Sequence, residues 1–183
     1  MRRDISEGHQ VSTANGINGA TTNGNTSSVE ELDILVIGGG FAGVYLLYQL
    51  RKLNFQVKVV EAGSDLGGVW HWNRYPGARV DSQYPVYSYS LPEVYEDWTW
   101  SCHYPDWEEI QEYFQHVDRK LGIKKDTVFN TKVTDATFDE KSNQWTVLCD
   151  TGKTFRVQYL IASTGFAAKR YICSGPLANK LNW

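Results

Sequence analysis

The stretch of sequence from Leu32 to Glu61, LDILVIGGGFAGVYLLYQLRKLNFQVKVVE, decides the fold. It opens with the apolar run 33–37, which is typical of a strand buried on both faces in a parallel sheet. Three glycines end this run, and apolar residues then recur at helical spacing from Phe41 up to Asn54. A second β-branched run covers 56–61. Residues 32–61 therefore predict one βαβ unit.

Glycines 38, 40 and 43 form the pattern G-x-G-x-x-G directly after this strand. One glycine permits a tight turn, one lets the backbone approach a pyrophosphate, and one allows close packing of helix on sheet. The N-terminus of the following helix offers unpaired N–H groups and partial positive charge to phosphates. Glu61 ends the second strand, where a carboxylate can accept both ribose hydroxyls of an adenosine. Gly38, Gly40, Gly43 and Glu61 therefore predict binding of FAD or NAD, because a carboxylate there disfavours the 2′-phosphate of NADP.

The composition excludes several other classes of protein. The chain has 183 residues, of which 42% are hydrophobic, so collagen-like, coiled-coil and wholly disordered chains are excluded. A net charge of −3 without a basic stripe argues against nucleic acid as a partner. No apolar run approaches the ~18 residues of a membrane span, and no secretory signal is evident. The three widely spaced cysteines lack metal-ligand spacing and indicate reduced thiols in a cytoplasmic protein.

The rest of the chain divides by composition and periodicity. Residues 1–29 are rich in Asn, Gly, Thr and Ser and predict a disordered tail, whereas the aromatic stretch 62–104 predicts a functional loop. Asp106 and Glu109 have the spacing of a capping box before a helix with the apolar stripe Ile110, Phe114, Val117 and Leu121, ended by Gly122. Strands are expected at 127–133, 135–138, 144–149 and 154–162. The prediction is an α/β, Rossmann-like domain over 30–168, with a parallel sheet and an inserted β-meander, followed by an irregular segment 169–183.

The segment from Gly67 to Asp81, GGVWHWNRYPGARVD, resembles the class B flavoprotein monooxygenases, and within them the Baeyer–Villiger monooxygenases. Their pattern is GGTWYWNRYPGARCD, so twelve of fifteen positions match and Val69, His71 and Val80 depart from it. The continuation through Tyr87–Ser90 and Trp98–Trp100 is most similar to fungal enzymes that tailor meroterpenoid and polyketide natural products. The resemblance covers about residues 30–168, and it implies an incomplete FAD-binding domain.

The resemblance also implies roles for individual residues toward two cofactors, FAD and NADPH. Val69, Trp70, His71 and Trp72 would lie along FAD, and Tyr87 would contact it. Asp81 would contact both FAD and the nicotinamide, within a segment where Arg79 and Val80 meet NADP. Val133 would stand where a backbone group reads the adenine. The catalytic group of the family is an arginine from later in the chain, so no catalytic residue is expected here. Trp98, Trp100, Trp107 and Trp145 are predicted to pack in the core.

In such an enzyme NADPH reduces FAD, and one atom of O₂ is inserted beside a ketone carbonyl to give an ester or lactone. The 183 residues contain neither a second G-x-G-x-x-G nor the signature F-x-G-x-x-x-H-x-x-x-W-P, so a short or truncated form is expected. Two alternatives stay open. One is a non-catalytic flavin-binding chain that needs a partner supplying the NADPH half. The other is an NAD-binding module of a dehydrogenase. The segment around Asn73 argues against this alternative, because a simple dehydrogenase has no use for such a segment.

Overall fold

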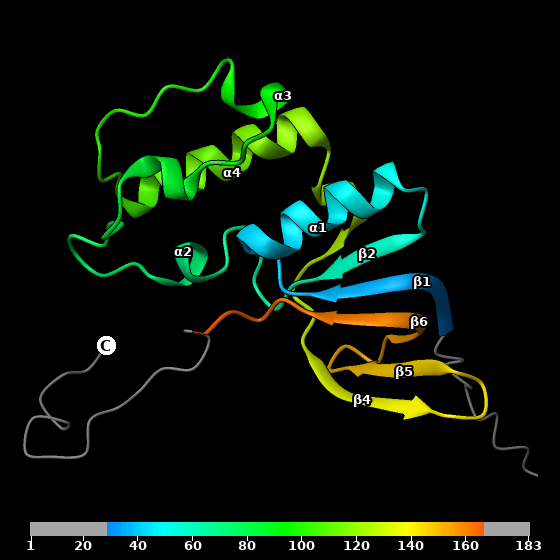
Figure 1. The fold of residues 1–183 in the computed structure, drawn as a ribbon. Helices are drawn as coiled ribbons and strands as arrows, with labels where there is room; N and C mark the ends of the chain where they lie inside the picture. Colours follow the sequence, from blue (N-terminus) through cyan, green and yellow to red (C-terminus); the bar gives the residue numbers. More distant parts are fainter. Residues whose placement is uncertain (1–28, 167–183) are drawn as a thin grey trace, which may run out of the picture.

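The computed structural model describes residues 29–166, which form one sheet with its helices gathered on one side (Figure 1). The strand order is β3-β2-β1-β6-β5-β4. Four strands run parallel, namely β1 (Val29–Ile37), β2 (Val57–Val60), β3 (Thr127–Val128) and β6 (Thr154–Ala162). The other two, β4 (Val133–Asp139) and β5 (Gln144–Cys149), continue the sheet in antiparallel fashion. The tail predicted before the first strand, like the segment predicted at 169–183, lies outside the described residues.

The predicted βαβ unit is confirmed. β1 pairs with β2 in parallel from Ile34↔Val57 to Ile37↔Val60, and α1 (Phe41–Lys52) connects them. The helix ends two residues earlier than the apolar spacing predicts, because Asn54 adopts a left-handed conformation with φ of 64°. The right-handed crossover puts α1 on one face of the sheet.

The predicted meander is also confirmed, but the prediction of a strand over 127–133 before it is wrong. Instead of a strand over 127–133, β3 ends at Val128 and β4 begins at Val133. Between them Asn130 has φ of 51°, and the N–H groups of Asn130 and Thr131 donate to the carbonyls of Gly63 and Glu61. Residues 130 and 131 therefore bend around the end of β2. The hydrogen bonds that they make there replace those of a sheet, so the strand is interrupted.

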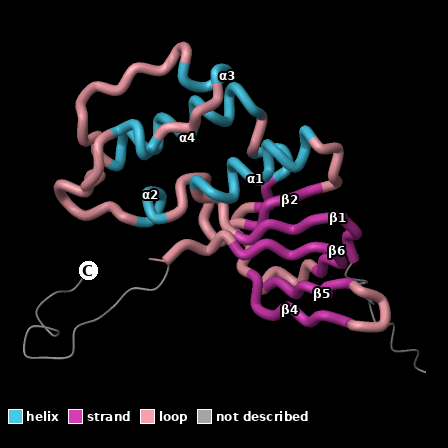
Figure 2. Tube along the Cα trace, in the orientation of Figure 1, coloured by secondary structure: helices cyan, strands magenta, loops and turns pink. Residues whose placement is uncertain are grey.

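Buried apolar side chains form two cores on opposite faces of β1. Val36 packs with Val44 of α1 on the helical face, whereas the adjacent Leu35 packs with Val147 and Phe155 of the meander. Successive side chains of a strand point to opposite faces, so one strand serves both cores. Figure 2 shows the helices and the strands as separate halves of the molecule. The prediction of a strand buried on both faces is confirmed.

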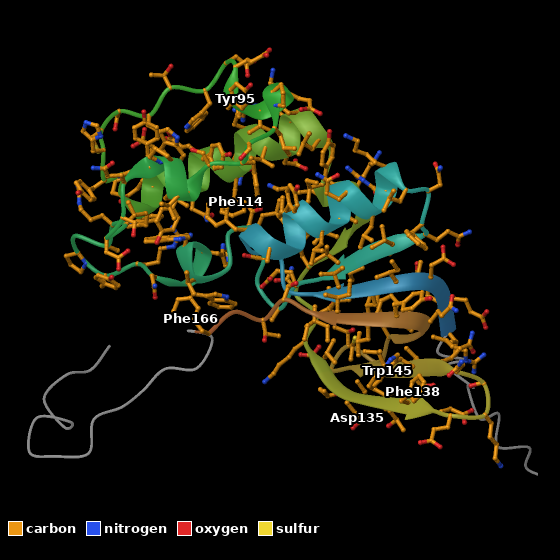
Figure 3. The ribbon with its side chains drawn as sticks, viewed as in Figure 1. Tyr95, Phe114, Asp135, Phe138, Trp145 and Phe166 are labelled. Atoms are coloured by element: carbon orange, nitrogen blue, oxygen red, sulfur yellow. The ribbon has the colours of Figure 1, made fainter. Side chains whose placement is uncertain are left out.

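The long helix α4 (Trp107–Leu121) begins and ends as its sequence predicts. The side chain of Asp106 accepts a hydrogen bond from the N–H of Glu109 (3.0 Å), and Gly122 closes the helix in the left-handed conformation. Only this half of the predicted capping box forms, because the Glu109 carboxylate accepts from the N–H and hydroxyl of Ser101. Phe114 lies between α4 and α1, and Trp145 packs beside Phe138 on the meander (Figure 3). The four tryptophans predicted as core all pack against the two cores, which confirms that prediction.

The aromatic stretch 62–104 is less irregular than predicted. It contains three helices of four residues each, α2 (Val69–Trp72), η1 (Tyr84–Tyr87) and α3 (Pro92–Tyr95). A short 3₁₀ helix, η2 (Lys124–Asp126), precedes β3. Elements this short carry no periodicity that a sequence pattern could reveal. Across residues 29–166, no helix has the length and apolar character needed to cross a membrane.

Alkaline pH is expected to destabilise this helical core. Burial raises the pKa of Tyr113 to about 12, above the value of about 10 for an exposed tyrosine. The stability from the neutral phenol is complete below pH 10 and is lost as the pH rises from 10 to 12. We expect Tyr113→Phe to lose stability less steeply than wild type over that range, as measured by chemical unfolding at each pH. The exposed Tyr159 provides the control, since Tyr159→Phe should leave the slope unchanged.

Candidate dinucleotide site

Three loops meet at the carboxyl ends of the parallel strands. The loop after β1 is tied to its neighbours because the Gly38 N–H donates to the Val60 carbonyl (2.8 Å), and the Ser163 N–H donates to the Ile37 carbonyl (2.8 Å). The carboxyl edge of a parallel α/β sheet is where such folds bind ligands. The predicted glycine pattern and Glu61 both lie at this edge.

The three glycines of the G-x-G-x-x-G pattern differ in what surrounds them. A Cβ at Gly43 would lie 1.9 Å from the carbonyl oxygen of Gly38, so this glycine lets α1 pack on the loop. Gly38 has φ of 108°, and its Cβ would lie 2.5 Å from the Ser163 carbonyl oxygen. Gly40 has an ordinary φ of −82°, and its Cβ would meet Gly68 Cα at 3.5 Å, a normal contact. The protein's own packing therefore requires glycine at 38 and 43, but not at 40.

Gly67 and Gly68 form a second pair of glycines, which faces Gly39 and Gly40. Gly67 donates its N–H to the carbonyl of Gly39 (3.0 Å), and a Cβ at Gly68 would lie 3.1 Å from Gly40 Cα. Both Gly67 and Gly68 have positive φ, at 129° and 56°. We call Gly39, Gly40, Gly67 and Gly68 the glycine cradle. It presents backbone without side chains at the N-terminus of α1, where N–H groups are unpaired.

Glu61 is almost fully buried beside the glycine cradle, with 6% of its surface exposed. One carboxylate oxygen accepts from the Gly39 N–H (2.5 Å) and the other from the Gly63 N–H (2.6 Å). Each carboxylate oxygen has two lone pairs, so both retain capacity for a ribose hydroxyl. Glu61 therefore also fixes the loop, a second role that its position in the sequence did not predict.

The helix α2 places aromatic side chains next to these loops. Trp70 is buried and packs edge-on against the ring of Tyr87, with centroids 5.7 Å apart. His71 lies against Gly63, and its Nδ1 is buried without a hydrogen-bond partner among residues 29–166. Trp72 is exposed, with its ring edge-on to that of His71. A buried unpaired nitrogen is unusual, and at a site edge it indicates a group that a ligand could satisfy.

The structure also brings Asp81 and Tyr87 together. Burial raises the pKa of Tyr87, and the charge and hydrogen bonding of Asp81 raise it further. The preceding residues are bound to the chain before α4, since Arg79 donates to the Tyr104 carbonyl (2.6 Å) and Val80 to the Pro105 carbonyl (3.1 Å). Among the described residues, no group of three His, Cys, Asp or Glu side chains could hold a metal ion.

Comparison with known proteins agrees with this geometry. Residues 36–104 match the family described as NAD(P)-binding Rossmann-like domain. The chain is 52% identical over 142 residues to the FAD-binding monooxygenase acrE of Aspergillus aculeatus, covering 78% of this chain and 24% of the relative. It is 46% identical over 144 residues to cyclopentanone 1,2-monooxygenase of a Comamonas strain, covering 79% of this chain and 26% of the relative. The chain thus spans about a quarter of the length of the curated relatives it matches.

Solved structures give the same result. A closed crystal structure of cyclohexanone monooxygenase matches with a TM-score of 0.77 at 30% identity, over 80% of this chain and 28% of that one. An oxidised steroid monooxygenase bound to NADP matches with a TM-score of 0.72 at 40% identity, over 74% of this chain and 26% of that one. Over about three quarters of its length, the chain is therefore similar to the Baeyer–Villiger flavoprotein monooxygenases.

Two residues to which the resemblance assigns cofactor contacts lie at the margin of the site. Val133 begins β4, pairs with Cys149, and packs against the second core. It follows Thr131, whose N–H donates to the Glu61 carbonyl (3.0 Å), so the start of β4 stays near the end of β2. Val69 begins α2 directly after the glycine cradle and packs against the first core.

Some residues that build the site were missed as site residues by the sequence analysis. Gly63 and Ser163 supply backbone contacts, and Gln111 of α4 packs against Gly67. The Gly67-Gly68 pair was visible only through the Baeyer–Villiger pattern. Gln111 had no signal, because a polar residue on an amphipathic helix is normally assigned to the solvent face.

Proposed function

We propose that residues 29–166 bind FAD and form the flavin-binding part of a Baeyer–Villiger monooxygenase. The observation that carries this proposal is the glycine cradle at the N-terminus of α1, beside the carboxylate of Glu61. Gly40 supports it most directly, because neither its φ nor the ordinary contact that a Cβ would make with Gly68 requires a glycine there, whereas the approach of an outside group does.

The described residues fit FAD in three respects. The N–H groups of Gly39 and Gly67 are used within the protein, so the cradle offers those of Gly40 and Gly68, with the N-terminus of α1, to a pyrophosphate. Glu61 retains lone pairs for ribose hydroxyls. The Nδ1 of His71 adds a buried polar atom to which no other described residue is hydrogen-bonded. The likeness to monooxygenase structures, one solved with FAD and NADP, supports the same assignment.

When bound, FAD supplies the redox chemistry between NADPH and O₂. The chain's own residues bind and orient it. We assign the pyrophosphate to the backbone of Gly38–Gly40, the adenosine ribose to Glu61, and the adenine to the backbone at Val133. Val69–Trp72 and Tyr87 would lie along the cofactor and exclude water. Asp81 would hold a negative charge between FAD and the nicotinamide, and Arg79 and Val80 would border NADPH.

We propose ketones as the substrates of the whole enzyme, with oxygen inserted beside the carbonyl. This is supported by relatives named cyclopentanone 1,2-monooxygenase and acetone monooxygenase. We also propose the role in fungal meroterpenoid or polyketide biosynthesis that the sequence resemblance implies, and similarity to FAD-binding monooxygenases of Aspergillus aculeatus and Byssochlamys spectabilis is in keeping with it. Binding of NADPH would also need a part of the enzyme outside residues 29–166, in the same polypeptide or in a partner chain.

Direct binding measurements test the proposed function. We expect calorimetry to show tighter binding of FAD than of NAD to the 183-residue chain, with an absorbance spectrum typical of protein-bound flavin. Tighter binding of NAD would contradict the flavoprotein assignment and favour the dehydrogenase module.

Glu61→Gln is expected to weaken FAD binding. The amide keeps the shape of the side chain but loses the charge and one of two accepting oxygens, and each hydrogen bond to a charged group is worth about 1.5–3 kcal/mol. We therefore expect a Kd at least about tenfold higher by calorimetry. Glu31→Gln is the control, because Glu31 is exposed and pairs with Arg156 at the opposite end of β1. An unchanged Kd for Glu61→Gln would contradict the ribose assignment.

A further inference from the structure

Three polar side chains connect the loop after β2 to α4 and η2. Asp65 accepts from the Gln115 amide (2.9 Å) and forms an ion pair with Lys124 (2.8 Å). Lys124 also donates to the amide oxygen of Gln115 (2.7 Å), which closes a triangle of contacts. We call these residues the Asp65 cluster. Burial works to raise the pKa of Asp65, but hydrogen bonds from Lys124, Leu66 and Gln115 outweigh it and lower that pKa.

Asp65 of this cluster lies two residues before Gly67, the first glycine of the second half of the glycine cradle. One turn of α4 away from Gln115, the amide of Gln111 donates to the Leu66 carbonyl (3.3 Å). The same amide nitrogen would lie only 2.1 Å from a Cβ at Gly67. Gln111 and Gln115, one turn apart on α4, therefore contact residues 65–67. Gly67 is in turn hydrogen-bonded to the Gly39 carbonyl, which links this loop to the other half of the glycine cradle.

Lys124, at the other end of the cluster, is connected through α4 and η2 to α1, the helix whose N-terminus would face the phosphates. The N–H of Lys124 donates to the Asp118 carboxylate (2.7 Å), which fixes η2 against α4. Arg51 of α1 donates to the carbonyls of Leu121 and Gly122 at the end of α4. It also pairs with Asp126 (2.8 Å). Helices α1 and α4 are thus joined, and α1 carries Gly40 at its N-terminus.

We propose that the Asp65 cluster positions Gly67 and Gly68 against Gly39 and Gly40, and thereby sets the affinity of the site for the pyrophosphate of a dinucleotide. The cluster side chains act through the backbone of residues 66–68. One hydrogen bond, from Gly67 to Gly39, joins the two halves of the cradle directly. A shift of the loop would therefore separate the backbone donors that must converge on one ligand. This inference rests on the proposed binding of FAD.

The test uses Asp65→Asn, Lys124→Met and Lys124→Arg in the 183-residue chain. We expect the first two to raise the Kd for FAD by about three- to tenfold, the effect of losing one or two hydrogen bonds of the cluster. Lys124→Arg keeps the charge and the donors, so its Kd should stay within about twofold of wild type. Lys120→Met is the matched control, because Lys120 of α4 pairs with exposed Asp97 instead of Asp65, and the variant should leave the Kd unchanged.

A readout that does not depend on FAD separates positioning from general stability. In the chain without cofactor, Asp65→Asn and Lys124→Met should accelerate hydrogen exchange of the Gly67 amide, whereas exchange in the β4–β5 hairpin stays as in wild type. Equal Kd values and equal exchange in all variants would overturn the positioning role while wild-type FAD binding stands. Wild type that fails to bind FAD would overturn the proposed function, and with it this inference.

Discussion

Gly40→Val is expected to abolish measurable FAD binding while leaving the chain folded. A valine Cβ would meet Gly68 Cα at an ordinary 3.5 Å, and the φ of −82° suits an L-residue. The two methyl groups would then fill the gap between Gly40 and Gly68, where the pyrophosphate must approach the backbone. We expect the Kd to rise at least about a hundredfold, equivalent to about 2.7 kcal/mol.

Calorimetry measures the affinity, and thermal unfolding without cofactor measures the stability of the same sample. Gly40→Ala provides an intermediate case, because it adds the Cβ without the branches. Its affinity should fall less than that of Gly40→Val. Normal FAD binding by Gly40→Val would show that the glycine serves the turn and that no phosphate approaches it.

Gly43→Ala is expected to destabilise the fold itself. Alanine within a helix normally gains about 1 kcal/mol over glycine. Here its Cβ would lie 1.9 Å from the Gly38 carbonyl oxygen, a backbone atom that no side-chain rotation can move. Forcing α1 away from the loop should cost about 1–3 kcal/mol, as overpacking does elsewhere.

Thermal unfolding without cofactor checks this result, with a decrease in Tm of several degrees expected for a chain of this length. Gly40→Ala is the matched control, since it adds the same methyl group three residues earlier, where the Cβ makes only an ordinary contact at 3.5 Å. A Gly43→Ala chain as stable as wild type would show that the helix and loop are less closely packed than the structure has them.

The sequence could predict what depends on local patterns. The βαβ unit followed from the buried run before Gly38, and the limits of α4 followed from Asp106 and Gly122. It could not predict where β3 ends, because Val128–Val133 has β-branched residues at both ends and the interruption comes from hydrogen bonds to Gly63 and Glu61. Those carbonyls are distant in sequence, so no local pattern could reveal the contact.

The candidate site divides in the same way. The glycine pattern and Glu61 could be identified from type and spacing, since their chemistry is fixed by the backbone they serve. The contact of Gln111 with Gly67 could not be predicted, because the two residues are 44 positions apart in the chain and meet only through tertiary packing. The assignments of Val69–Trp72, Arg79–Asp81, Tyr87 and Val133 to cofactors stay predictions.

The parallel pairing of β1 with β6 has a consequence for how the chain folds. Contacts such as Arg156 with Glu31 join residues 125 positions apart, whereas β1 and β2 meet across a single helix. Bringing together such distant segments costs loop-closure entropy before any contact compensates for it, and slows folding. During synthesis β1 must wait until β6 has left the ribosome, so its second edge stays unpaired for most of the time in which residues 29–166 are made.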